Sequence, residues 1–341
     1  MRILNIDGTY FVPEFRRLGH EVLAIGPAGR RGLDVDIDTT MSLQRLTQVL
    51  DANGFVPDLV FWCDTSIPPC VVGLSELPAP TIAYSIDQYL NPWHVPYSMG
   101  FDLVLVAQKD YLPLFEHVDH PRRIRWFPLF CKPDVDVDPG GERDIPVSFV
   151  GTVEGTINAA RKHFLKDFKR QHPLYVTQGA YAPVFGRSRI VLNQSAAGEL
   201  NFRLFEAAAC GAAVLTEATQ NGLTDLFAVD EEILVYTRGD AASAAGVARL
   251  MLAQPGRLAE IAAAGRDKVL RRHSVASRAR TIVSEGERLL RKASWKQRMK
   301  RRTLIEAELA KTCIALATDD TLPLPEEHRR HYAELAHLYT R

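Results

Sequence analysis

The sequence lacks several features that would assign a protein to a class at once. No apolar run reaches the roughly 18 residues that a membrane-spanning helix needs, so we predict no transmembrane segment. The 41 basic residues balance 41 acidic ones, which leaves no overall field to attract nucleic acid, and we expect no nucleic-acid partner. The five cysteines are scattered through apolar stretches and form no Cys-x-x-Cys pair. This usage predicts reduced, buried thiols, no zinc site and a cytoplasmic protein.

Short apolar runs alternate with helical stretches along the first half, which is typical of a parallel sheet with crossover helices. Residues 1–7 are too few for a signal peptide and are expected to begin this sheet. The predicted strands lie at 2–6, 21–25, 59–63, 81–85, 103–107 and 124–129. Because parallel strands all end at one edge, we expect Asp7, Asp64, Asp87 and Lys109 on a single rim that faces a partner domain.

A chain of 341 residues exceeds the size at which one core keeps growing, so two domains are expected. Prolines and glycines interrupt the pattern near 132–143, which predicts domains at 1–138 and 139–290. Strands of the second domain are predicted at 147–151, 174–177, 190–193, 213–216 and 233–236. A helical tail, 291–341, could cross back to the first domain. Seven cations in 291–302 indicate either a solvated helix or a contact with anionic lipid or an acidic partner.

The most informative stretch is Asn201–Gly211, followed by Ala213–Thr216. Arg203 and Glu206 are three residues apart and therefore share one helical face. Gly211 offers a helix stop before a short buried strand. Polar groups near such α-β units can bind ligands beyond the carboxyl ends of the strands, although a surface ion pair is the plainer alternative.

This stretch resembles the CgeB-like (spore-maturation protein type) glycosyltransferases of GT-B fold over roughly residues 146–285. The shared residues continue with Leu215-Thr216, Leu226-Phe227, Glu231-Glu232, Tyr236, Gly265-Arg266 and His273. The resemblance implies an α/β protein with two Rossmann-like doubly wound domains facing a cleft. The second domain would bind a nucleoside-diphosphate sugar and the first would present an acceptor. The N-terminal half resembles the family only in its alternation of strands and helices.

The implied reaction is transfer of a sugar with stabilisation of the departing diphosphate, without a metal or other cofactor. Arg203 is the expected cation, and Asn221-Gly222 the expected helix N-terminus at the phosphates. Glu206 would accept hydrogen bonds from the ribose hydroxyls. Many retaining enzymes of this fold carry a second Glu eight positions earlier, where this chain has Gly198 with Glu199 beside it. The stereochemical outcome therefore stays open.

Other donor-site candidates lie where strands of the second domain end. Gly151 and Thr152 would let a phosphate or sugar approach the backbone, and the loop with Gly179 and Tyr181 would hold the base. Ordinary turns are the alternative. Asn201 begins the helix of Arg203 and belongs to the same set. Arg161 and Lys162 could supply a second phosphate cation or could be a solvated helix face.

For the acceptor we expect a general base in the first domain: Asp87 first, then Asp7, then His94, which could instead pack against Trp93. Nearby aromatic residues could stack on a sugar or form core: Tyr84, Tyr89, Trp93 and Tyr97. The Asp-x-Asp run at 34–38 is interpreted as a solvated strand edge and the run at 134–138 as part of the linker between the domains, and neither is interpreted as a metal site. The alternatives are an epimerase acting on the donor alone, a non-catalytic nucleotide-sugar-binding scaffold and a metal-dependent transferase.

Overall fold

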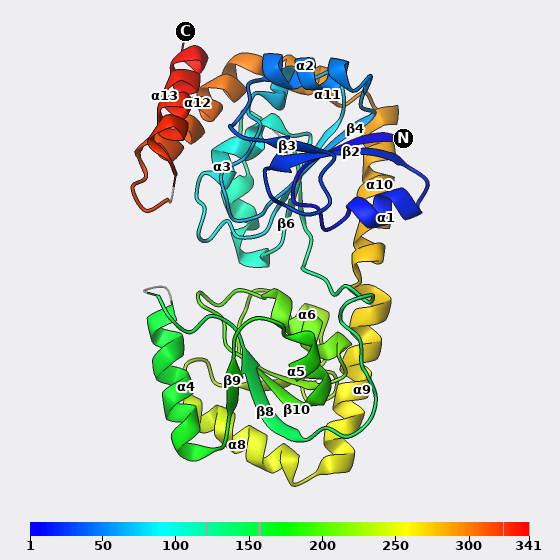
Figure 1. Cartoon of the computed structure of the whole chain (residues 1–341), viewed down its shortest axis with the longest axis vertical. Coiled ribbons are helices and arrows are strands. Elements are labelled where there is room, and N and C mark those ends of the chain that lie inside the picture. The colour runs from blue at the N-terminus through cyan, green and yellow to red at the C-terminus, as the bar shows by residue number, and fades with distance from the viewer. Residues whose placement is uncertain (121, 156–157, 323, 341) are drawn as a thin grey trace. The chain divides into compact units, whose positions relative to one another are not determined.

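The computed structural model describes residues 1–120, 122–155, 158–322 and 324–340 (Figure 1). The chain forms two compact units, Met1–Phe127 with Ala279–Arg341, and Pro128–Arg278. Each unit contains one sheet in which every pair of neighbouring strands is parallel. Among the described residues, no helix combines the length and the apolar character that crossing a membrane requires.

The first unit has a seven-stranded sheet in the order β3-β2-β1-β4-β5-β6-β7. Its strands are β1 (Arg2–Asp7), β2 (Glu21–Pro27), β3 (Val35–Ile37), β4 (Leu59–Cys63), β5 (Thr81–Ser85), β6 (Leu103–Val106) and β7 (Arg123–Trp126). Every residue of β4, β5 and β6 is buried, as expected for parallel strands with both faces covered. The order reverses between β1 and β4, which creates a switch point at the carboxyl ends of these two strands.

The helices of this unit come from both ends of the chain. They are α1 (Val12–Arg17), α2 (Leu43–Ala52), α3 (His94–Tyr97), most of α10 (Val275–Arg291), α11 (Trp295–Met299), α12 (Arg302–Thr318) and α13 (Glu326–Tyr339). Figure 1 shows α12 and α13 side by side. Leu309 and Cys313 of α12 and Tyr332 of α13 belong to the core of this unit. The C-terminal helices therefore pack onto the N-terminal sheet.

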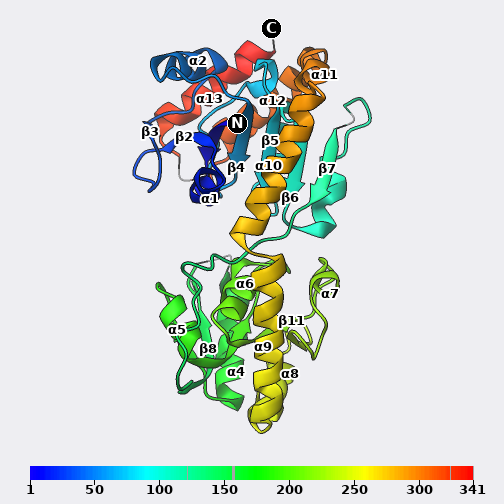
Figure 2. The ribbon, with the colours of Figure 1, turned by 90° about the vertical axis from the view of Figure 1, so that its right-hand side faces the viewer.

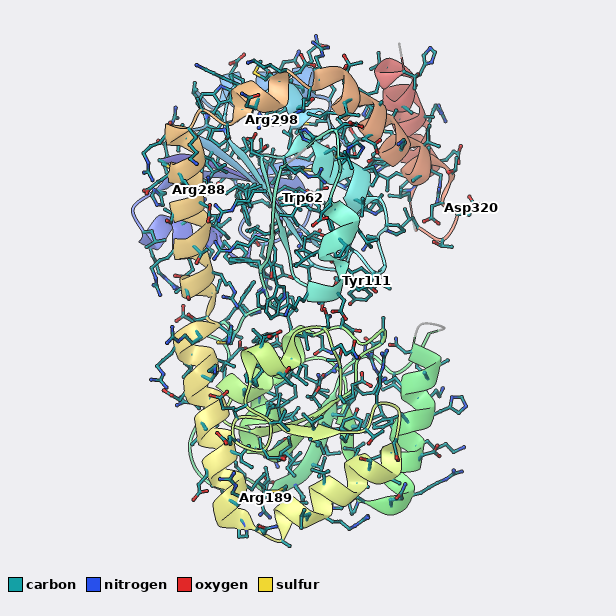
Figure 3. All side chains as sticks on the ribbon, turned by 180° about the vertical axis from the view of Figure 1, so that it is seen from behind. Trp62, Tyr111, Arg189, Arg288, Arg298 and Asp320 are labelled. Atoms are coloured by element: carbon teal, nitrogen blue, oxygen red, sulfur yellow. The ribbon has the colours of Figure 1, made fainter. Side chains whose placement is uncertain are left out.

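The cationic run 291–302 contains one residue that is fully buried, Arg298 (labelled in Figure 3). Its guanidinium donates to the carbonyls of Ser75, Leu77 and Ala79 over 3.1, 2.6 and 3.0 Å, and it pairs with Asp102. The side chains of this pair are only 1% and 4% exposed. Arg298 therefore anchors α11 inside the unit and is not part of a charged outer face.

The second unit has a five-stranded sheet in the order β12-β11-β10-β8-β9. Its strands are β8 (Ile145–Val150), β9 (Tyr175–Thr177), β10 (Ser188–Asn193), β11 (Ala213–Glu217) and β12 (Leu234–Tyr236). Its helices are α4 (Ala159–Gln171), α5 (Ala182–Arg187), α6 (Phe202–Ala209), α7 (Leu223–Leu226), α8 (Ala241–Leu252) and α9 (Pro255–Arg272). Helix α6 packs against α9, and both contact β11 (Figure 2). Two parallel-sheet α/β units with C-terminal helices confirm the predicted fold class.

The observed units divide elsewhere than at the expected boundaries, 138 and 290. The backbone of Cys131 accepts from Val275 and donates to His273, each over 2.8 Å, which attaches the segment after Phe127 to the second unit. Further along α10, Glu285 pairs with Arg123 and Arg125 of the first unit. The Pro- and Gly-rich stretch interrupts periodicity, but these contacts decide to which unit each segment belongs. The run 34–38 contains the edge strand β3, and its three aspartates are exposed, which confirms the expected solvated strand edge.

Candidate functional site

Arg203 lies at the carboxyl edge of the second sheet, where α6 begins. Its Nε donates to the Val150 carbonyl over 2.9 Å and its Nη1 to Asn193 Oδ1 over 2.8 Å, at the ends of β8 and β10. The guanidinium also lies over the Phe149 ring, 4.4 Å from the centroid. Within the described part of the chain, Nη2 donates no hydrogen bond. Burial lowers the pKa of Arg203 to about 10, so it remains a cation at neutral pH.

A second arginine reaches the same ring. Arg161 of α4 is buried and lies 5.7 Å from the Phe149 centroid. It donates to the Thr152 carbonyl and to Gln194 Oε1, each over 2.9 Å. After burial, its charge is the next cause that lowers the pKa of Arg203. The neighbouring Lys162 is exposed and pairs with Glu154, so the two cations expected together lie in different environments.

Gly151 provides the space that Arg203 occupies, because a Cβ at this position would collide with Nη2. Thr152 follows it and is exposed, with its hydroxyl accepting from Gln178 over 3.3 Å. Gly179 lies after β9 with a φ of 100°, in open space. These residues place a small, polar backbone segment beside the guanidinium of Arg203.

Glu206 belongs to a cluster that the sequence did not indicate. Tyr181, which precedes α5, donates to Asp136 Oδ1 over 2.8 Å. Asp136 is buried and accepts from the Lys132 amide over 2.6 Å. Burial, followed by the charge of Asp136, raises the pKa of Glu206 to about 7. The Asp134–Asp138 run was expected to belong to the linker between the domains, and no spacing rule connects Asp136 to residues 45 and 70 positions away.

The loop between β10 and α6 is braced by carboxylates. Glu199 accepts from the amides of Ala196 and Ala197 over 3.0 and 2.7 Å, so it faces its own loop. Glu217 accepts from the Ser195 amide over 2.9 Å. Asn201 caps α6 in backbone conformation, but its side chain makes no cap hydrogen bond, and its buried Oδ1 lacks a partner among the described residues.

Asn221 and Gly222 follow β11 at the same edge. Gly222 has a φ of 84° and precedes α7, which is a single turn and therefore carries little dipole. The Asn221 amide donates to Thr219 Oγ1 over 3.3 Å, and that hydroxyl donates to the Gly198 carbonyl over 2.9 Å. This turn is thus linked to the loop that precedes α6.

In the first unit, Asp7 ends β1 with a φ of 68° and is almost completely buried. It accepts from Trp62 Nε1 over 2.7 Å and from the Cys70 amide over 3.3 Å (Trp62 is labelled in Figure 3). Burial raises its pKa to about 6. Trp62 packs with Trp93 and Tyr97, and Tyr84 is also buried, so these aromatic residues form core.

His94 and Asp87 lie beside the ends of β4 and β5. Burial lowers the pKa of His94, whose Nδ1 lies 2.9 Å from Ser85 Oγ and whose Nε2 lies 3.5 Å from Asp64 Oδ1. Asp87 is half-buried, and its carboxylate accepts from Ser66 and from Tyr89. The Asp64 carboxylate accepts from the Asp87 amide over 2.8 Å, which joins Asp64 and Asp87 at this edge. Asp87 is thus the most accessible of the three candidate bases.

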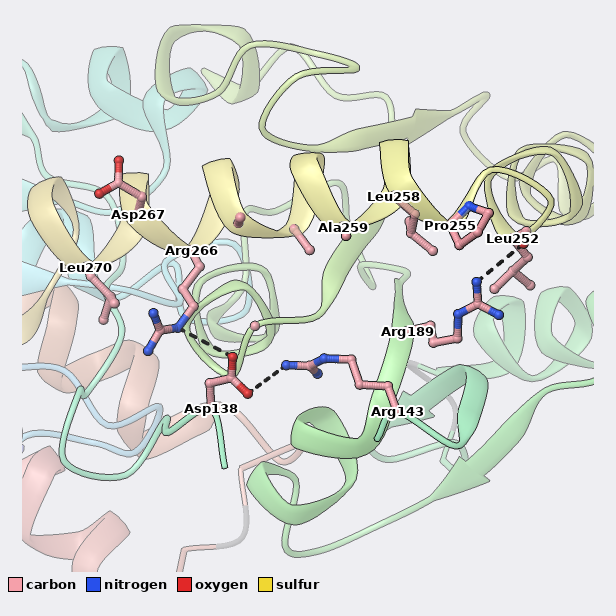
Figure 4. A pocket seen from close by; sticks show the side chains of 13 residues that line it. Asp138, Arg143, Arg189, Leu252, Pro255, Leu258, Ala259, Arg266, Asp267 and Leu270 are labelled. Atoms are coloured by element: carbon pink, nitrogen blue, oxygen red, sulfur yellow. Dashed lines mark hydrogen bonds and ion pairs between the residues drawn. The ribbon is translucent and has the colours of Figure 1, made fainter. Parts of the chain in front are cut away.

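A pocket of about 830 Å³ lies beside the start of β10 and the end of α6, lined largely by α9 (Figure 4). Arg143 donates to the Cys210 carbonyl over 3.1 Å and pairs with Asp138, while Arg266 donates to the Ala209 carbonyl over 3.2 Å. These two arginines satisfy carbonyls at the C-terminal end of α6. Among the described residues, no group of three or more His, Cys, Asp or Glu is arranged to hold a metal ion.

Residues 142–284 match a family model described as glycosyl transferase-like. No curated protein sequence matches significantly. A glycosyltransferase from Rickettsia africae superposes with a TM-score of 0.65 at 12% identity, covering 85% of this chain and 98% of that chain.

Two further solved structures are similar. The Anabaena protein HepE, in complex with UDP and glucose, has a TM-score of 0.61 at 13% identity, covering 83% of this chain and 98% of that chain. An α,α-trehalose-phosphate synthase (UDP-forming) from Burkholderia vietnamiensis has a TM-score of 0.60 at 10% identity, covering 85% and 99%. The chain has the GT-B fold of these glycosyltransferases, and its residues 142–284 are similar to the glycosyl transferase-like family.

Proposed function

We propose that this protein is a metal-independent glycosyltransferase of the CgeB-like type, whose second unit binds a nucleoside-diphosphate hexose. The observation that carries the proposal is the pair Arg203 and Arg161, gathered over Phe149 at the carboxyl edge of the sheet. Hydrogen bonds from Nε and Nη1 fix the position of the Arg203 guanidinium, while Nη2 donates to no acceptor among the described residues. A preorganised cation of this kind suits the charge that develops on a departing diphosphate.

Each donor-site residue has a proposed role. Glu206 accepts from the ribose hydroxyls, and the phosphates lie near Arg203. Backbone groups around these side chains complete the site at Gly151, Thr152, Asn201, Asn221 and Gly222. The loop with Gly179 and Tyr181 contacts the nucleobase of the donor. Two of the similar structures, HepE with UDP and glucose and the UDP-forming synthase, suggest UDP-sugars as the first donors to test.

We further propose that Asp87 takes the proton from the acceptor, because its carboxylate is the least buried of the three candidates in the first unit. Asp7 and His94 are held by internal hydrogen bonds and are weaker candidates. Those same bonds favour one alternative, a scaffold that binds the donor without transferring it. A cytoplasmic location and a surface contact through 291–302 stay predictions.

The test is a panel of UDP-, GDP- and ADP-sugars, measured for binding by calorimetry and for hydrolysis or transfer with and without EDTA. We expect one donor class to bind and to be turned over in the presence of EDTA. Binding without turnover would support the scaffold. Failure of every donor to bind would contradict the proposed site, and turnover that depends on Mg²⁺ or Mn²⁺ would contradict the metal-free reaction.

A further inference from the structure

The pocket beside α9 lies apart from the candidate donor site. Its volume is about 830 Å³, and all of its lining residues belong to the second unit. Arg189 is the second residue of β10 and Gly211 precedes β11, so the pocket lies where these parallel strands begin. Arg203 bonds to residues at the carboxyl ends of β8 and β10. The two sites therefore lie at opposite edges of the sheet.

The walls of the pocket are aliphatic. Its apolar lining side chains are those of Leu252, Pro255, Leu258, Ala259, Ala262, Ala263 and Leu270. No aromatic residue is among the described residues that line it, so a nucleobase would find no ring on which to stack. Strand β10 is paired on both sides, by β8 and β11, and therefore offers no open edge to an extended peptide. The walls favour a ligand with an aliphatic body.

Most of the charges in the pocket are compensated within the chain. Arg143 pairs with Asp138 over 2.8 Å, and its remaining hydrogen bonds go to backbone carbonyls. Asp267 pairs with Arg271, which lies outside the pocket lining. Arg266 has its Nε 4.0 Å from a carboxylate oxygen of Asp138. An anion would therefore meet a carboxylate beside Arg143 and beside Arg266.

Arg189 is the exception. Its Nη2 donates to the Leu252 carbonyl over 3.3 Å, while within the described chain its Nε and Nη1 donate no hydrogen bond and it pairs with no carboxylate. Figure 4 shows its guanidinium beside Leu252 and Pro255, where α9 begins. The first turn of α9 contains no acidic residue, so the positive end of this helix adds to the potential of Arg189. This end of the pocket is cationic and has no counter-charge in the described residues.

We propose that the pocket binds a single-chain amphipath with an anionic head. The carboxylate or phosphate of the head accepts charge-assisted hydrogen bonds from Arg189, and the alkyl chain lies along the aliphatic face of α9. The volume falls within the range of about 300–1,000 Å³ that is typical of small-molecule sites. Head and chain together match both properties of the pocket, its cation and its apolar wall. The proposal does not rest on the proposed glycosyl transfer.

Calorimetry with decanoate tests the site, and we expect one decanoate to bind per chain. Each buried methylene changes affinity about fourfold, so octanoate should bind about 15-fold more weakly. 1-Decanol has the same chain without the charge, and the lost charge-assisted hydrogen bond should weaken its binding by about 10- to 150-fold. Decyl phosphate is the second anionic probe. Both anions should bind more tightly than 1-decanol, and the tighter of the two identifies the preferred head.

Two variants and a matched control locate the ligand. Arg189→Gln keeps a donor for the Leu252 carbonyl and removes the charge, so decanoate should bind it about as weakly as 1-decanol binds the parent. Ala263→Glu introduces a carboxylate at an exposed position of the aliphatic wall and should abolish decanoate binding. Arg257→Gln removes a cation from the same end of α9 but outside the pocket lining, where Arg257 donates to the Asp230 carbonyl over 2.7 Å. It should leave the affinity unchanged.

Thermal unfolding without ligand checks that each variant is folded, and Ala263→Glu still tests the site if Arg189→Gln is not. Arg203→Ala should bind decanoate as the parent does, because Arg203 lies at the other edge of the sheet. The inference is overturned if decanoate does not bind, if 1-decanol binds as tightly as decanoate, or if Arg257→Gln weakens binding as much as Arg189→Gln. Loss of decanoate binding in a folded Arg203→Ala would place the ligand at the donor site and would also overturn it.

Discussion

Arg203→Ala separates the ligand-binding role of this residue from its structural role. The Nε and Nη1 groups of Arg203 are committed to Val150 and Asn193, while Nη2 donates to no described acceptor. The side chain is charged at pH 7, because this pH lies about three units below the Arg203 pKa of about 10. Alanine removes both the proposed charged donor for the diphosphate and three internal hydrogen bonds, the third of which runs from Nη1 to the Gln194 carbonyl over 3.3 Å.

The expected magnitudes follow from these contacts. A hydrogen bond to a charged group contributes about 1.5–3 kcal/mol, which corresponds to a loss of donor affinity of about 10- to 150-fold. The loss of the three internal bonds should lower the free energy of unfolding by about 1 kcal/mol each. The melting temperature of the second unit should therefore fall by several degrees, and binding must be measured well below the lower value.

The assay is calorimetry with UDP-glucose at 15 °C, together with thermal unfolding. Arg143→Ala is the matched control, because Arg143 donates to the carbonyls of Phe185, Gly186 and Ser188 near the start of β10 and belongs to no proposed binding group. It should lower the melting temperature and leave the affinity unchanged. The reasoning is refuted if Arg203→Ala binds as tightly as the parent, or if Arg143→Ala weakens binding equally.

Three further predictions concern stability, metal dependence and the acceptor. Arg298→Met leaves the buried Asp102 without its cation and should lower the free energy of unfolding, measured by urea titration, by about 3–5 kcal/mol. The double variant that also carries Asp102→Asn should recover much of this loss. No recovery would contradict the ion-pair explanation. Turnover should persist in EDTA, and a loss reversed by Mg²⁺ would favour a metal-dependent transferase. Asp87→Asn should slow turnover roughly 10²–10⁴-fold with donor affinity nearly unchanged, and retention of more than about a tenth of the rate would exclude Asp87 as the base.

Local patterns in the sequence were sufficient for the strands. Strands β4, β5 and β6 were predicted because parallel strands that are buried on both faces are continuous apolar runs. Such a run can be recognised in the sequence without knowing which strands lie beside it. Arg203 and Glu206 were placed on one helix for a similar reason, since their spacing matches the helical repeat. Polar residues after strands were likewise expected at one edge, which Asp64 and Asp87 illustrate.

Contacts between distant residues were decided only by the tertiary structure. Arg298, one of seven cations in a short run, is buried because Asp102, 196 residues away, compensates its charge. Asp136 joins the candidate site because the segment after Phe127 packs on the second unit and brings its carboxylate to Tyr181. Desolvation and the fields of neighbouring charges depend on distance in space, so neither the burial of Arg298 nor the raised pKa of Glu206 has a signal in residue spacing.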